Sequence, residues 1–182
     1  IVSPITFLST VNCIEYQKAQ PDFVDIEPYT YTIDVNKLED KIKKYKKNNK
    51  KIKAVIGVDY AGHPCDWIAL RYLANRYNFM LINDNCHALG SKYYRSLKYS
   101  TKYADLVTQS YHTVKNITTG EGGAVLTNNK YFYEKIKYLR SHGMIRDKKK
   151  LPKDSGGWFY EMQNLGYNFR LSEIQCALGI SQ

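Results

Sequence analysis

Short apolar runs alternate along the chain with longer segments whose apolar residues recur every three or four positions. The short runs, at residues 52–58, 79–82, 106–111 and 124–127, are the right length for strands and are rich in β-branched or other apolar side chains. The longer segments include two that begin at Asp34 and Asp66, where an aspartate side chain can accept hydrogen bonds from the first free N–H groups of a helix. This alternation predicts an α/β fold with a largely parallel sheet.

The remaining segments fit the same architecture. Residues 2–7 predict a short strand followed by a helix to about residue 18, residues 22–26 a strand, and residues 131–139 a helix. In the helix after Asp66 we expect Ile68, Leu70 and Leu73 to face the core. Residues 148–157 are polar, with a proline and paired glycines, and predict a loop. Because the chain begins at Ile1 and residues 171–182 predict a helix without a stop signal, we expect a fragment of a longer protein.

Composition narrows the class of protein. With 43% hydrophobic and 24% charged residues, and no apolar run near the roughly 20 residues of a membrane span, the chain resembles a globular protein that does not enter membranes. The formal charge is +10, and much of the excess lies in residues 41–53. That run could bind nucleic acid, but it lacks the arginines and interleaved aromatic residues of such modules, which favours a solvated helix end and loop.

The cysteines, at positions 13, 65, 86 and 176, form no CxxC pair and have no histidine at ligand spacing. This argues against a zinc site or a disulfide framework, so we expect no bound metal. Four reduced and mostly buried thiols would be typical of a cytoplasmic enzyme.

Candidate chemistry lies where predicted strands end. In open α/β sheets, ligands bind beyond the carboxyl ends of the strands. Asp84 follows the strand at 79–82, and the segment SYHTVKNITTGEGG, with Lys115 in it, follows the strand at 106–111. A carboxylate and an amine could therefore converge on one ligand. The run Gly120–Gly123 has neither P-loop nor Rossmann spacing, so we interpret it as a close backbone approach beside Lys115.

A resemblance makes this hypothesis specific. The segments SPITFLSTVN, VDYAGHPCD, LINDNCHALGS, SYHTVKNITTGEGGAVLTNN, YLRSHG and LGYNFRLSEIQCALG occur in the order found in the DegT/DnrJ/EryC1/StrS family of sugar aminotransferases, which the chain resembles over nearly its whole length. The resemblance implies the type I fold of pyridoxal-phosphate (PLP) transferases, with helices on both faces of the sheet. Residues 1–182 would be part of the large PLP-binding domain. The upstream phosphate-binding segment and the small C-terminal domain would lie outside this chain.

The resemblance also implies roles for individual residues, each with a plainer alternative. Lys115 would form the Schiff base with PLP rather than be one more surface lysine, and Asp84 would face the pyridine nitrogen rather than cap a turn. Three further side chains would contact the same cofactor: His87 near the ring hydroxyl, Ser110 at the phosphate and Phe7 stacked on the ring, where the alternatives are a structural histidine, a turn serine and a core phenylalanine. Asn168 would reach the cofactor phosphate of a neighbouring subunit, which implies a homodimer with shared active sites.

The implied reaction is amino transfer from L-glutamate to C4 of a nucleotide-linked 4-keto-6-deoxy sugar. Within the family the order of segments is most similar to the branch that acts in pseudaminic acid biosynthesis, which uses a UDP-linked sugar, whereas other branches use GDP- or dTDP-linked sugars. Sister dehydratases carry histidine in place of the lysine, so Lys115 argues for amino transfer. His112 could face the sugar. A basic nucleic-acid-binding module and a catalytically inactive relative remain as alternatives of other classes.

Overall fold

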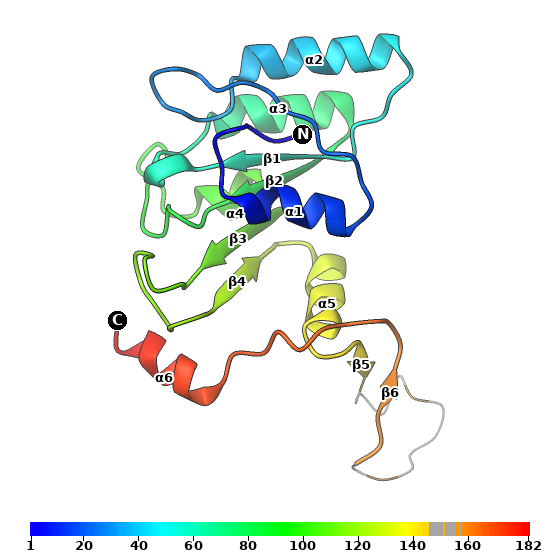
Figure 1. Ribbon diagram of the computed structural model, residues 1–182, viewed down its shortest axis with the longest axis vertical. Helices are drawn as coiled ribbons and strands as arrows, with labels where there is room; N and C mark the ends of the chain where they lie inside the picture. The colour runs from blue at the N-terminus through cyan, green and yellow to red at the C-terminus, as the bar shows by residue number, and fades with distance from the viewer. Residues whose placement is uncertain (146–150, 152–155, 157) are drawn as a thin grey trace.

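The computed structural model describes residues 1–145, 151, 156 and 158–182. Its centre is a four-stranded sheet in the order β1-β2-β3-β4 (Figure 1). The strands are β1 (Ala54–Val58), β2 (Met80–Asp84), β3 (Leu106–Ser110) and β4 (Gly123–Leu126). β1, β2 and β3 pair in parallel, and β4 runs antiparallel to β3. The predicted α/β fold with a mostly parallel sheet is therefore confirmed.

Helices lie on both sides of this sheet (Figure 1). A short 3-10 turn, Tyr60–Gly62, follows β1, and a two-stranded sheet pairs β5 (Met144–Ile145) with β6 (Glu161–Met162). The α-helices are α1 (Leu8–Tyr16), α2 (Val35–Lys47), α3 (Trp67–Tyr77), α4 (Tyr99–Tyr103), α5 (Lys130–Leu139) and α6 (Glu173–Ile180).

The two faces of the sheet have separate apolar cores because side chains alternate along each strand. The larger core lies on the face covered by α2, α3 and α4; its strand residues are Val55, Leu81 and Val107. The smaller core takes the alternate strand positions Ile56, Val58 and Ile82 against Val11 and Ile14 of α1. β1 and β2 are thus apolar on both faces, as expected of parallel strands between helices.

The predicted helix starts are confirmed. The Asp34 carboxylate accepts hydrogen bonds from the N–H groups of Asn36 and Lys37, and the Asp66 carboxylate accepts one from Ala69. One facing prediction was wrong: Ile68 is 48% exposed, whereas Leu70 and Leu73 are buried. Ile68 lies on the outer side of α3, next to the N-terminal turn where the Tyr93 hydroxyl reaches its N–H group.

The two predicted strands near the N-terminus are wrong as continuous strands. Val2 makes isolated bridges with Phe23 and Ile56, and Ile26 makes one with Ile33. These segments add single pairings beside β1 instead of full ladders. The predicted loop at 148–157 lies almost wholly outside the described residues. The helix predicted within 171–182 is α6, which begins with a capping box at Ser172.

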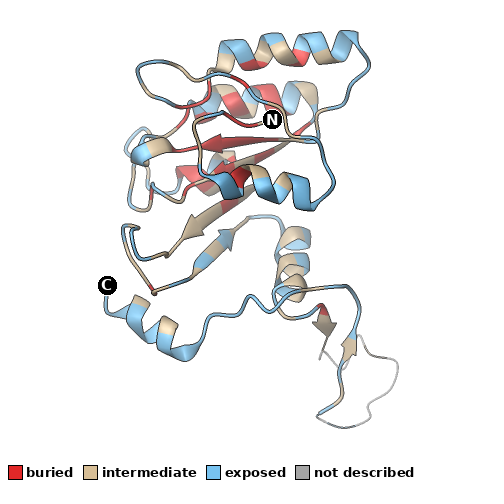
Figure 2. Cartoon of the chain, in the orientation of Figure 1, coloured by how far each residue is buried: buried red, intermediate tan, exposed pale blue. Residues whose placement is uncertain are grey.

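Burial is concentrated around β1, β2 and β3, and the chain after β4 is mostly exposed (Figure 2). Neither α5 nor α6 contains a buried residue. The expectation of mostly buried cysteines was wrong: all four are free, but only Cys65 is buried, and Cys13 and Cys176 are exposed. Within the described residues, none of the helices has both the length and the apolar character that a membrane crossing requires.

Candidate functional site

Asp84 is the last residue of β2, and its carboxylate is fixed from two sides. The Thr10 hydroxyl, from α1, donates to Asp84 Oδ2 over 2.8 Å. The Cys86 N–H donates to Asp84 Oδ1 over 3.2 Å. The Thr6 hydroxyl in turn donates to Thr10 over 3.0 Å, which holds the Thr10 hydroxyl in the donor orientation. Asp84 is therefore an oriented acceptor at the carboxyl edge of the sheet.

Three strand ends meet around this carboxylate. Tyr60, just after β1, lies with its ring centroid 6.3 Å from that of His87, which follows β2. Desolvation lowers the pKa of His87, the Lys115 charge lowers it further, and Asp84 raises it. Desolvation also raises the pKa of the Cys86 thiol to about 12, with Asp84 adding to the increase and Lys115 opposing it. These interactions place Asp84, His87 and Lys115 in one electrostatic environment.

Lys115 lies in a half-buried loop between β3 and β4. Its N–H donates to the carbonyl of His112 over 3.0 Å, which forms a tight turn directly after the strand. Ser110 ends β3, and its hydroxyl oxygen accepts a hydrogen bond from the N–H of His112 over 3.3 Å. That oxygen keeps its own hydrogen, so the Ser110 hydroxyl can still donate to an anion.

The glycine-rich turn packs as closely as the sequence predicted. A Cβ at Gly123 would lie 2.6 Å from the carbonyl oxygen of Gln109, and one at Gly122 would lie 2.2 Å from Thr119 Oγ1. Gly120 has a φ of +76°, in the left-handed region that favours glycine. The turn therefore fixes the return of the chain into β4 beside the Lys115 loop. His112 Nε2 and Glu121 Oε1 are 3.7 Å apart across it.

Phe7 lies at the N-cap of α1, and its side chain is 71% exposed. A core position for Phe7 is therefore excluded. Its carbonyl accepts the N–H of Thr10 over 3.1 Å, so Phe7 stands in the same turn as the threonine that holds Asp84. An exposed aromatic side chain next to the carboxyl edge is available to a ligand bound there.

Asn168 lies apart from the other predicted site residues. It forms an antiparallel bridge with Ser141, directly after α5, and is itself exposed. Backbone hydrogen bonds from Tyr167 to Leu139 and from Phe169 to Arg140, 2.7 and 2.9 Å long, anchor its segment to the end of α5. The structure therefore brings together Asp84, His87 and Lys115, with Phe7 in the turn that carries Thr10 and Ser110 at the end of β3, whereas Asn168 lies on the segment after α5.

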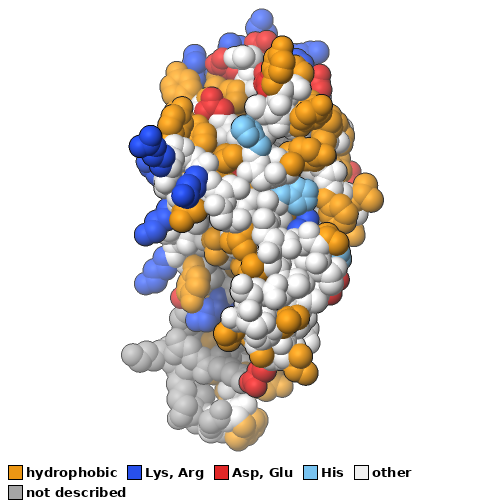
Figure 3. Space-filling model, turned by 90° about the vertical axis from the view of Figure 1, so that its left-hand side faces the viewer, with side chains coloured by type: hydrophobic (Ala, Val, Ile, Leu, Met, Phe, Trp, Pro, Cys, Tyr) orange, Lys and Arg blue, Asp and Glu red, His pale blue; other side chains and the backbone are white. Residues whose placement is uncertain are grey.

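Figure 3 faces the carboxyl edge and shows histidine side chains in the middle of this face, with Lys and Arg gathered mainly on one flank. The residue that sequence analysis missed is Thr10, which is 74 positions from Asp84 and lies within an otherwise ordinary helix. No sequence pattern links two such positions. Within the described residues, no group of three or more His, Cys, Asp or Glu side chains is placed to hold a metal ion.

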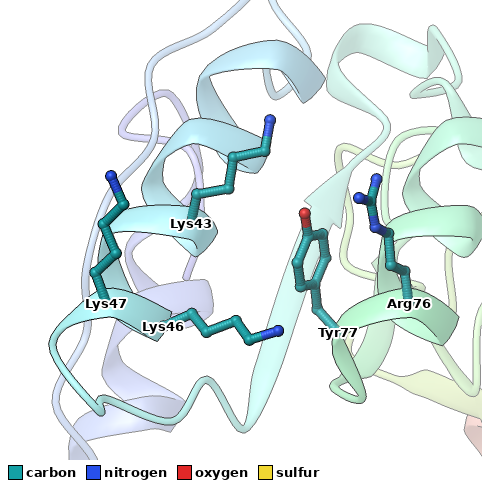
Figure 4. Close-up of a pocket in the computed structure, with 5 residues that line it drawn as sticks. All are labelled: Lys43, Lys46, Lys47, Arg76 and Tyr77. Atoms are coloured by element: carbon teal, nitrogen blue, oxygen red, sulfur yellow. The ribbon is translucent and has the colours of Figure 1, made fainter.

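A hollow elsewhere on the surface is lined mainly by Lys and Arg side chains, which lie near the C-terminal ends of two helices. It lies at the ends of α2 and α3 and is lined by Lys43, Lys46, Lys47, Arg76 and Tyr77 (Figure 4). Glu39 pairs with both Lys43 and Arg76 at 3.2 Å. Cations in the last turn of a helix also stabilise its unpaired carbonyl groups. This arrangement supports the interpretation of the lysine run as a solvated helix end.

Comparison with known proteins decides the family. The family model of the DegT/DnrJ/EryC1/StrS aminotransferases matches residues 1–182. The chain belongs to this family. It is 43% identical over 182 residues to the UDP-4-amino-4,6-dideoxy-N-acetyl-beta-L-altrosamine transaminase of Campylobacter jejuni (serotype O:23/36), covering 100% of this chain and 45% of the relative.

Solved structures of family members have the same fold. Helicobacter pylori PseC, an aminotransferase involved in the biosynthesis of pseudoaminic acid, superimposes with a TM-score of 0.84 at 37% identity, over 100% of this chain and 44% of PseC. Spr1654 of Streptococcus pneumoniae, solved in its PLP form, gives a TM-score of 0.79 at 27% identity, over 99% of this chain and 47% of that protein. The chain thus spans less than half the length of these family members.

The electrostatic contact between Lys115 and His87 is testable without any ligand. Replacing Lys115 with methionine removes a cation that lowers the pKa of His87, so the pKa of His87 should rise. The measurement is an NMR titration of the imidazole signals in the cofactor-free full-length protein. Lys102→Met, in α4, is the matched control and should leave the pKa of His87 unchanged. An unchanged pKa in Lys115→Met would contradict the contact.

Proposed function

We propose that the full-length protein is a PLP-dependent aminotransferase that moves an amino group from L-glutamate to C4 of a nucleotide-linked 4-keto-6-deoxy sugar. The observation that carries the proposal is the convergence of Asp84, His87 and Lys115 at the ends of adjacent parallel strands. Similarity to the Campylobacter jejuni transaminase supports a UDP-linked sugar as the acceptor, and similarity to Helicobacter pylori PseC supports the pseudaminic acid pathway.

The residues at the carboxyl edge fit PLP. A carboxylate whose orientation is fixed by Thr10 and Cys86 can accept the proton of a pyridinium nitrogen in a hydrogen bond. A half-buried lysine can supply the amine that binds the cofactor covalently, and a serine hydroxyl with a free hydrogen can donate to a phosphate. When bound, PLP supplies an electron sink that stabilises negative charge at the substrate carbon.

Each residue then has a defined task. Asp84 keeps the proton on the ring nitrogen, since a negative carboxylate beside it favours the protonated form. Lys115 would hold the cofactor through Nζ, and its amine would act as a general base and acid that takes up and returns a proton.

The remaining contacts position the cofactor. Phe7, exposed in the same turn as Thr10, would stack on the ring, and His87 would lie near the ring hydroxyl. The Ser110 hydroxyl, which accepts from the His112 N–H, would donate to the phosphate. Asn168 would serve the cofactor phosphate of a second subunit; its exposed position, bridged to Ser141 after α5, supports that assignment.

The same reasoning gives the place of this chain in the whole protein. We propose that residues 1–182 are part of the large cofactor-binding domain, with the phosphate-binding segment upstream and the small domain downstream. A homodimer with shared sites would cover apolar side chains that are exposed here, among them Leu165, Phe169, Ile174 and Ile180, which are 69–86% exposed. The cytoplasm is the compartment we propose.

Covalent trapping tests the cofactor site directly. Full-length protein incubated with PLP should develop a visible absorbance, and borohydride should fix the cofactor on Lys115. Peptide mass spectrometry locates the label. Lys92→Met, a surface lysine after β2, is the control and should label at Lys115 like the wild type. A label on another lysine, or continued amino transfer by Lys115→Ala, would refute the assignment.

The sugar acceptor requires a separate experiment. The enzyme is given L-glutamate and, in parallel, UDP-, GDP- and dTDP-linked 4-keto-6-deoxy sugars, and products are identified by mass spectrometry and NMR. We expect amination at C4 of the UDP-linked sugar with the highest kcat/KM. Highest kcat/KM with a GDP- or dTDP-linked sugar would move the protein to another branch of the family, and no amination of any sugar would refute the function.

A further inference from the structure

Beneath the carboxyl edge lies a carboxylate that the proposed chemistry does not use. Asp59, directly after β1, is 0% exposed. Its Oδ1 accepts hydrogen bonds from the Cys65 N–H and the Trp67 Nε1–H, both at 2.9 Å. Its Oδ2 accepts three more, from Asn83 Nδ2 at 3.1 Å, Asn85 Nδ2 at 2.9 Å and the Tyr99 hydroxyl at 2.7 Å. We call Asp59, Asn83, Asn85, Tyr99, Gln109 and Tyr111 the Asp59 network.

Burying the polar groups of the Asp59 network is unfavourable for the free energy of folding. Burial raises the pKa of the Asp59 carboxyl, and the hydrogen-bond donors around it offset only part of that increase. Asn83 is also 0% exposed, and its Oδ1 has no hydrogen-bond partner in the part of the chain that the structure describes. Apolar residues of similar volume are often as stabilising as a buried charged cluster, or more so. We therefore ask which residues the Asp59 network positions, rather than how much it stabilises the core.

One arm of the network sets the direction of Asp84. Asn83 and Asn85 are the residues on either side of it, and Asp59 holds the amide groups of both. Because side chains alternate along a strand, fixing both neighbours on one side of β2 turns Asp84 to the other side. That is the side of α1, where the Thr10 hydroxyl meets the Asp84 carboxylate.

The other arm reaches the base of the Lys115 loop. Gln109 Nε2 donates to Asn85 Oδ1 over 3.3 Å, and the Tyr111 hydroxyl donates to Gln109 Oε1 over 3.1 Å. The backbone of Tyr111 closes the loop, because its carbonyl accepts the N–H of Thr119 at 2.9 Å and its N–H donates to Gly122 at 2.8 Å. Hydrogen bonds thus link Asp59 through Asn85 and Gln109 to Tyr111. Tyr111 is the residue whose backbone closes the base of the Lys115 loop.

We infer that Asp59 is a positioning residue, which fixes the Asp84 carboxylate and the Lys115 loop relative to each other. The inference rests on the proposed function, since it concerns the two residues to which that function assigns the cofactor. Because Asp59 is 0% exposed, its carboxylate would touch neither cofactor nor substrate. A displacement of about 1 Å at a reacting group can cost roughly 100-fold in rate, so a rigid link between the two groups has a large effect on catalysis.

The experiment compares three variants of the full-length protein loaded with PLP. Asp59→Asn places an amide nitrogen against the three donors at Oδ2, and Gln109→Met cuts the link to the Lys115 loop while keeping Asp59 intact. Asp105→Asn is the matched control: Asp105 Oδ2 accepts the Leu81 N–H over 2.7 Å at the opposite end of β2. The readouts are the visible circular dichroism of bound PLP, kcat and KM for both substrates, and Tm.

We expect Asp59→Asn and Gln109→Met to change the visible circular dichroism and to lower kcat by roughly 10- to 100-fold, with smaller changes in KM. Asp105→Asn should lower only Tm. If both network variants keep the wild-type spectrum and kcat and lose only Tm, the network is merely structural and the inference is overturned. Should Asp59→Asn not fold, Gln109→Met decides. Failure of the wild type to trap PLP on Lys115 would instead overturn the proposed function, and this inference with it.

Discussion

The parallel pairing of β2 with β3 is the constraint on which the site depends. Parallel strands end at the same edge of a sheet, so Asp84 at the end of β2 and the Lys115 loop after β3 are brought together although they are distant in the sequence. The antiparallel return of β4, with Gly123 opposite Ser110, then fixes the far side of the loop. An apolar layer on each face holds the strands in this register.

The sheet brings the site residues to one edge, and polar contacts then fix the orientation of the Asp84 side chain. The Thr10 hydroxyl orients the Asp84 carboxylate from the α1 face, and Asp59 restrains the residues beside it from the opposite face. The site therefore has support on both sides of one strand. Precise placement of this kind is what a cofactor enzyme requires of its protein, because the cofactor carries the bond chemistry and the residues supply orientation and charge.

Much of this could be predicted from the sequence, because strand ends and close turns are local features. Apolar runs followed by polar residues located Asp84 and Lys115, and the glycine run predicted the close return beside them. Motif order then gave the family. The aspartate caps of α2 and α3 were equally visible, since the hydrogen bonds involved span only two or three positions.

The features that the sequence did not predict, or predicted wrongly, depend on tertiary contacts. The Thr10–Asp84 hydrogen bond spans 74 positions, and Asp59 accepts hydrogen bonds from residues up to 40 positions away, so neither leaves a local pattern. Ile68 matched helical spacing but lies on the outer side of α3, because the core there is filled by Trp67, Leu70 and Leu73. Residues 22–26 have strand character yet make only single bridges, because among the described residues Phe23 pairs with Val2 alone and Ile26 with Ile33 alone.

The most direct test of the account is the comparison of Asp84→Asn with the wild type, measured as kcat and as PLP bound per subunit. Asparagine keeps the shape of the side chain and its hydrogen bond from Cys86, but loses the negative charge that, in the proposed function, would keep the ring nitrogen of bound PLP protonated. We expect kcat to fall by about 100-fold or more, the usual scale for losing a proton-controlling group, while PLP occupancy changes little. Equal kcat in the two proteins would contradict the central claim that Asp84 and Lys115 act on one cofactor.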